Sequence, residues 1–234
     1  MAKSHICSIG LSFPHDDVSF LEFHSGASLL DAADIILFSP TLQYDTDYSS
    51  PTYQGKPNLT DTSSIQNRDS LKHWRSQLIE SYNSGATIFM FLTSSEEVFA
   101  ATGTQDFSGT GRNQKVIRHV GEIDSHQALP ITFEKITASK GERVKLTKDG
   151  AILSAFWKSL SEIAHYECYF EIKNVTPLIV TRTGDKCVAA RFTGKKGNLI
   201  VLPVLDFDRD SFRVYDEEKE AWYWSDGAVR HAKA

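Results

Sequence analysis

Short, continuous apolar runs recur along the first half of the chain and alternate with polar stretches. Their length and their content of Ile, Leu and Phe are typical of strands buried on both faces of a parallel sheet. A further apolar segment, residues 18–23, is compatible with either a strand or a helical turn. The three clearest runs cover residues 5–11, 33–38 and 86–92.

One stretch has helical spacing instead. In residues 67–83 the large apolar side chains recur every three or four positions, so they form one stripe along a helix. Gly85 follows, and glycine ends helices because it adopts the left-handed conformation without Cβ strain. Helix, glycine and buried strand in this order predict half of a βαβ unit. The stripe consists of Leu71, Trp74, Leu78 and Tyr82.

The regular alternation stops near residue 93 and returns later. Glycines and scattered polar residues over 93–138 indicate a loop-rich insertion, which we place near residues 94–150. A second amphipathic helix is expected over residues 151–164, followed by a strand over 165–172. The tetrapeptide Thr183-Gly184-Asp185-Lys186 has the turn chemistry of a β-hairpin. The short apolar runs beside it and after it are residues 178–182, 187–192 and 198–202.

These elements together predict a single α/β domain over residues 1–234. We expect a mostly parallel, flavodoxin-like sheet with helices on both faces, the inserted region, and an antiparallel hairpin towards the C-terminus. Residues 228–234 have the pattern of a helix that has only begun. That pattern favours this chain being the N-terminal part of a longer protein.

Composition and charge narrow the class of protein. A chain of 234 residues can bury about 70% of its surface, so its core needs no disulfide or metal. The three cysteines form no C-x-x-C pair, and no cofactor is predicted. No signal peptide or membrane-spanning apolar run is present, which favours a cytoplasmic protein. The net charge of −5 argues against nucleic-acid binding by the whole surface and leaves a local basic patch open.

Three stretches resemble a known superfamily. They are HWRSQLIESYNSGATIFMFL (residues 73–92), ADIILFSP (33–40) and PLIVTRTGDKCVAARFTGKKGNLIVLPVLDF (177–207). Together they are similar to the class I glutamine amidotransferase-like superfamily, in the branch of the ThuA-like and β-galactosidase-trimerisation-like domains. The resemblance implies a central parallel sheet and a strand-to-helix elbow after its central strand.

Catalytic members of that superfamily carry a Cys or Ser on this elbow, flanked by glycines. Here the matching stretch is Leu92-Thr93-Ser94-Ser95-Glu96-Glu97, which contains no glycine. A strained elbow without glycine is costly. The resemblance therefore implies a pseudoenzyme that has kept the sheet and lost the nucleophile.

Two serines still allow a catalytic alternative. Ser94 and Ser95 follow a buried strand, at the edge where open α/β sheets place their ligands. A serine nucleophile needs a base, and His119, His126 and His165 are the candidates. The competing interpretation makes one of these serines the N-cap of a short helix.

Two further patterns bind ions in other proteins. Asp206, Asp208 and Asp210 alternate, with Glu217 following, which imitates a calcium loop. Ser211 stands where such a loop requires glycine, so a solvated acidic loop is the favoured interpretation.

The cysteines Cys7, Cys168 and Cys187 lie on predicted strands, where buried and unreactive thiols are expected.

A glycine-rich basic segment covers residues 108–115. Its backbone N–H groups and the side chains of Arg112 and Lys115 could hold an anion such as a nucleotide phosphate. The segment lacks the G-K-[ST] ending of a phosphate-binding loop, so a mobile surface loop is the alternative. The glycines in question are Gly109 and Gly111.

Aromatic residues gather near the C-terminus as Trp222, Tyr223 and Trp224. Trp and Tyr dominate interface hot spots, so the cluster predicts either a contact with a partner or packing that closes the fold. We conclude from the sequence that a non-catalytic binding or assembly module is favoured, with a protein partner or a homo-oligomer. A serine hydrolase or amidase and a nucleotide or phosphate sensor are the alternatives.

Overall fold

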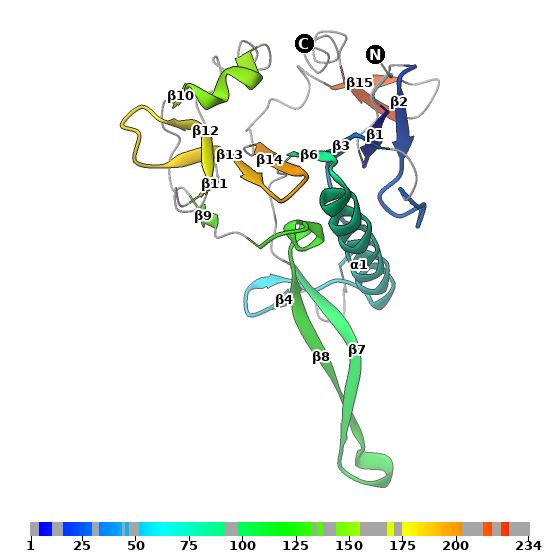
Figure 1. The fold of residues 1–234 in the computed structure, drawn as a ribbon. Coiled ribbons are helices and arrows are strands. Elements are labelled where there is room, and N and C mark those ends of the chain that lie inside the picture. Colours follow the sequence, from blue (N-terminus) through cyan, green and yellow to red (C-terminus); the bar gives the residue numbers. More distant parts are fainter. Residues whose placement is uncertain are drawn as a thin grey trace.

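The structure is a computed structural model in which twelve segments of the chain are described (Figure 1). All statements below concern these segments. They are residues 5–10, 16–29, 33–43, 45–46, 52–91, 98–132, 135–137, 144–154, 168–170, 175–202, 213–216 and 221–224.

Five parallel strands form one side of a ten-stranded sheet. Among them β1, β3 and β6 confirm the three predicted buried strands, and residues 18–21, which the sequence left open, are a strand. Across the sheet these strands follow the order β2-β1-β3-β6-β14. The consecutive side chains of Ile36, Leu37 and Phe38 are all buried, because both faces of the sheet are covered there. The strands are β1 (Ile6–Ile9), β2 (Val18–Leu21), β3 (Ile35–Phe38), β6 (Thr87–Phe91) and β14 (Asn198–Leu202).

Antiparallel strands extend the sheet beyond β14. The predicted hairpin is confirmed: β12 pairs with β13, and Gly184 in its turn has a φ of +85°. The Asp185 carboxylate accepts hydrogen bonds from the Thr181 and Thr183 hydroxyls, which fixes that turn. The added strands are β9 (Lys135–Thr137), β10 (Val144–Leu146), β11 (Cys168–Phe170), β12 (Thr176–Thr181) and β13 (Cys187–Thr193).

Helix α1 (Asp61–Ser84) begins six residues before the predicted start and ends, as predicted, at Gly85 with a φ of +119°. The first turns were missed because their buried positions are polar. Ser63 and Ser64 are fully buried there, so the apolar spacing does not reveal the helix. The Thr60 hydroxyl accepts a hydrogen bond from the Ser63 amide, and this cap sets the start.

The two faces of the sheet have separate cores. On one face the α1 stripe packs on β3 and β6, and Trp74 and Leu78 are fully buried. On the other face Leu153, Leu178 and Ile200 pack together. Here the short helix η3 (Asp149–Leu153) begins where the second helix was predicted, while residues 155–164 lie outside the described part. Among the described residues α1 is the one helix of seven or more residues, so helices on both faces stay a prediction.

The predicted loop-rich insertion is instead a long β-hairpin, and that part of the prediction was wrong. β7 (Val98–Ser108) and β8 (Lys115–Ile123) pair with each other in a separate two-stranded sheet, and a single bridge joins Phe99 of β7 to Asn58. Figure 1 shows this hairpin, hereafter the arm, projecting far from the body. The strands were not predicted because over residues 103–119 both faces of the arm are exposed to solvent, so burial requires no apolar face there.

Small elements complete the described structure, and no helix in it is long and apolar enough to cross a membrane. The β15–β16 hairpin contains the aromatic cluster as strand β16. These elements are β4 (Thr52–Tyr53), β5 (Lys56–Pro57), η1 (Gly111–Asn113), η2 (Ser125–Ala128), β15 (Arg213–Asp216) and β16 (Ala221–Trp224).

Two glycines with similar backbone angles test how tightly the sheet edge is packed. Gly10 ends β1 with a φ of +71°, and a Cβ there would overlap the carbonyl oxygen of Ser39. Gly26 has a φ of +64° with open space around it. We expect G26A to lower the free energy of unfolding by about 1–2 kcal/mol, from backbone strain alone. We expect G10A to lower it by about 2–5 kcal/mol, because the overlap adds to the strain.

Urea unfolding followed by circular dichroism measures both values. Equal losses for the two variants would contradict the close approach of β1 to the segment after β3.

Candidate functional site: the projecting arm

The predicted catalytic residues fall in different places. His119 lies on the exposed part of β8, and its Nε2 is 2.8 Å from Oδ2 of Asp106 across the arm. His126 is buried in η2, and its Nδ1 is 2.8 Å from Oδ1 of Asp124. Both imidazoles therefore contact carboxylates of their own segment. Ser94, Ser95 and His165 lie outside the described residues, so the serine hydrolase stays a prediction.

The predicted ion and interface residues are described only in part. The acidic residues Asp206, Asp208, Asp210 and Glu217 lie outside the described segments. Within those segments no group of three His, Cys, Asp or Glu side chains could hold a metal ion. Trp222, Tyr223 and Trp224 lie on β16, where Trp222 is paired with Tyr215 of β15. Their role in an interface stays a prediction.

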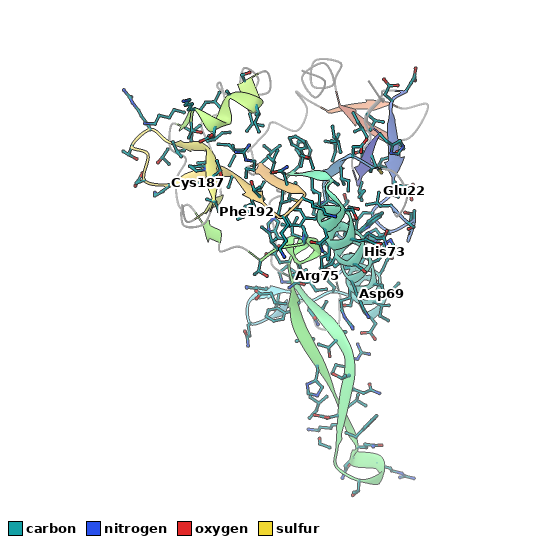
Figure 2. The ribbon with its side chains drawn as sticks, in the orientation of Figure 1. Glu22, Asp69, His73, Arg75, Cys187 and Phe192 are labelled. Atoms are coloured by element: carbon teal, nitrogen blue, oxygen red, sulfur yellow. The ribbon has the colours of Figure 1, made fainter. Side chains whose placement is uncertain are left out.

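Two of the three cysteines are buried and free, as predicted for unreactive thiols. Burial raises the pKa of Cys7, and it raises the pKa of Cys187 to about 12. Cys187 lies on β13 (Figure 2), where its Sγ donates to the Ala189 carbonyl at 3.1 Å. For Cys168 the strand β11 is described and the side chain is not.

The glycine-rich segment forms the tip of the arm. Gly109 and Gly111 have φ values of +86° and +57°, and a Cβ on Gly109 would lie 2.5 Å from the Asn113 carbonyl oxygen. The amides of Asn113 and Gln114 donate to carbonyls within the turn. The glycines therefore allow a tight turn, and two of its N–H groups are used inside it. The exposed side chains of Arg112 and Lys115 are what the tip offers to an anion.

The foot of the arm consists of residues 98–102 and 120–123, and beyond it the arm is exposed to solvent. Every residue from 103 to 119 is exposed, including Phe107, Val116 and Ile117 at 58%, 54% and 49%. Phe107 and Val116 are paired across the two strands, so they share one face. Ile117 is paired with Asp106 on the opposite face. Figure 2 shows side chains pointing outward on both sides of the arm.

The charge of the arm is opposite to that of the rest of the chain. Residues 103–119 contain three cationic side chains, Arg112, Lys115 and Arg118, against the single carboxylate of Asp106. Their net charge is +2 with histidine neutral, and the rest of the chain therefore carries −7 of the total of −5. The arm is therefore a basic segment of an acidic chain.

The foot of the arm is fixed firmly to α1. Arg68 donates to the Ala101 carbonyl at 2.8 Å, and the Ala101 amide donates to the Ser64 hydroxyl at 3.0 Å. Arg75, which lies where the arm joins the body (Figure 2), donates to the carbonyls of Gln127 and Leu129 at 3.0 and 2.9 Å. These helix residues were not singled out in the sequence, because nothing local indicates which carbonyls they meet.

A second group on α1 has the right atoms for catalysis and a structural explanation. His24 Nδ1 lies 2.8 Å from the Ser70 hydroxyl, so a base is next to an alcohol. The same side of α1 also binds neighbouring residues of the loop after β2, since Trp74 Nε1 donates to the Phe23 carbonyl at 2.6 Å. Gln77 Oε1 accepts from the Leu29 amide at 2.9 Å. The His24–Ser70 contact is therefore one of several bonds holding this loop to the helix.

The comparisons with known proteins identify no relative. No protein-family model matches the chain, and no curated protein matches its sequence. The candidate site therefore depends on the geometry of the arm.

The buried cysteines predict slow alkylation. A thiolate is the reactive form, and the raised pKa of Cys7 and of Cys187 keeps both thiols protonated at neutral pH. We expect iodoacetamide to leave both residues unmodified in the folded chain and to modify them in denaturant, as measured by peptide mass spectrometry. Equal modification rates in the two states would contradict the burial.

The loop after β2 predicts a pH-dependent stability. Burial lowers the pKa of His24 below its ordinary value of about 6.5, against smaller opposing effects of the Thr41 backbone and the Glu22 charge. Below pH 6.5 the unfolded chain therefore binds a proton that the folded chain does not. The stability from neutral His24 is complete above pH 6.5 and is lost as the pH falls through the lower, folded-state value.

We expect H24N to show a smaller loss of unfolding free energy between pH 7.5 and pH 5 than the wild type, by urea unfolding. Asparagine keeps a polar atom near Ser70, so the variant changes titration more than contacts. The same loss in both proteins would contradict the assignment.

Proposed function

We propose that this chain is a non-catalytic binding or assembly module, and that the arm is its docking element. The observation that carries the proposal is the exposure of Phe107, Val116 and Ile117 on a hairpin that pairs with no other strand. Complete burial of one such side chain contributes about 1.5–3 kcal/mol. Each of these side chains is 49–58% exposed, so a partner that covers the arm would gain about half of this for each one.

The way in which the arm is attached to the body supports a docking role more than an accidental exposure of its apolar side chains. An isolated two-stranded hairpin is marginally stable in water, so its foot needs support. Here the buried residues Val98, Ala100 and Ile123 and the hydrogen bonds from α1 supply that support. The foot therefore fixes the direction in which the arm leaves the body, and a fixed direction lowers the entropy that binding costs.

The order of the parallel strands supports the proposed kinship. Numbered along the chain, the five parallel strands follow 2-1-3-4-5, the order of flavodoxin-like sheets. We propose on this basis, and on the sequence resemblance, that the body is a glutamine amidotransferase-like sheet used as a scaffold. The kinship and the docking role are separate proposals, since the arm would dock in the same way on another fold.

Removing the exposed apolar side chains of the arm tests the function. We expect the natural protein carrying F107S and I117S to lose the partners, or the oligomer, found with the wild type after purification from its own cells. The thermal midpoint should change little, because substitutions at exposed positions typically alter stability by less than about 0.5 kcal/mol.

The matched control is I152S. Ile152 is 55% exposed and lies in η3, which packs against β12 in the body. The substitution therefore changes an equally exposed apolar residue that lies away from the arm. The proposal is wrong if the double variant assembles as the wild type does, or if the wild type associates with nothing.

A further inference from the structure

Building on the proposed function, we propose that the arm of one copy docks on the outer edge of strand β2 of a second copy. The contact would add the arm to the open side of the sheet, as in β-strand addition. Three observations support this contact. They are the apolar and basic surface of the arm, the apolar and acidic surface at the β2 edge, and the distance in space between these two surfaces within one copy.

The arm is suited to protein more than to a nucleic acid. Its exposed surface has three large apolar side chains, while Arg118 already contacts Asp61 of α1 at 3.3 Å. Arg112 and Lys115 then remain as the arm cations without an ion pair among the described residues. Affinity for nucleic acid comes mainly from many phosphate contacts, and two or three cations on a chain of net charge −5 provide few. An apolar surface with a basic tip matches an acidic, apolar protein surface.

Strand β2 offers such a surface. It is the last strand on its side of the sheet, and no described strand pairs with its outer edge. Phe20 on this strand is 43% exposed. An exposed acidic residue lies near each end of the strand: Asp16 precedes it and Glu22 follows it. The edge thus combines open backbone groups, an apolar side chain and negative charge, each of which complements the arm.

The opposite edge of the ten-stranded sheet fits less well. There β10 carries the exposed Lys145, which would repel the basic tip. Pairing of two arms would bring together two segments of net charge +2. Of the two edges β2 and β10 of this sheet, β2 therefore has the charge that complements the arm.

The positions of the two surfaces make the contact intermolecular. Figure 1 shows the arm pointing away from the side of the body that holds β2. The 11 residues of β7 span roughly 35 Å when extended, so the tip reaches well past its own body. Because arm and edge are different surfaces, two copies exchanging arms give a closed dimer, and unreciprocated contacts give a ring or a filament.

Charge reversal tests the contact on the complete, purified chain. We expect the wild type to self-associate with a dissociation constant measurable by analytical ultracentrifugation. R112E/K115E and D16K/E22K should each weaken association about tenfold or more, because each places like charges together. Combining both pairs should restore much of the affinity, and I152S should leave it unchanged.

Rescue is the decisive readout, since a variant that only misfolds is not rescued by a second pair of substitutions. Circular dichroism and thermal midpoints of all variants are measured alongside. A monomeric wild type, an oligomer indifferent to both charge pairs, or no rescue overturns the contact. Binding of the wild type to a 20-base-pair DNA or RNA duplex, lost in R112E/K115E, also overturns it.

The two experiments distinguish a failure of the β2 contact from a failure of the proposed docking function. If the purified chain is monomeric while F107S/I117S loses its partners in cells, the arm docks on another protein and only the β2 contact is wrong. If both experiments show no dependence on the arm, the docking function itself is wrong.

Discussion

One helix holds the described structure together through two kinds of contact. The apolar stripe of α1, with Trp74 fully buried, packs on the parallel strands. Its polar side-chain atoms bind backbone groups of segments outside the ten-stranded sheet: Trp74 Nε1 donates to the loop after β2, and Arg68 donates to the foot of the arm. A buried carbonyl left without a donor is costly, so these bonds decide where both segments lie.

This arrangement gives the arm its properties. Support ends where the contacts with α1 end, and beyond residue 103 both faces of the hairpin are in solvent. A fixed foot with an exposed tip presents a surface without ordering it at the moment of binding. The same constraint accounts for His24 and Ser70, which lie together because the loop is bound to the helix along its length.

The sequence predicted elements whose signal is local. The buried run at residues 33–38, the glycine at the end of α1 and the turn at Gly184 are each determined by a few neighbouring residues. It did not predict elements determined by distant partners. The first turns of α1 bury serines, and Ser64 accepts its hydrogen bond from Ala101, far along the chain. Over residues 103–119 the arm is a two-stranded sheet with no buried face. For the site, sequence identified the glycines and cations of the tip, whereas the apolar surface beside them is visible only once the strands are paired.

An exposed hairpin with apolar side chains also invites unwanted association, and the sequence of the arm limits this. Its cations lie close to Phe107 and Ile117, so two arms approaching each other meet repulsion before apolar contact is made. In the proposed docking, positive charge on the arm of a negatively charged chain disfavours the arm of another copy and favours an acidic surface. The apolar side chains would then supply the attraction that a few exposed charges cannot.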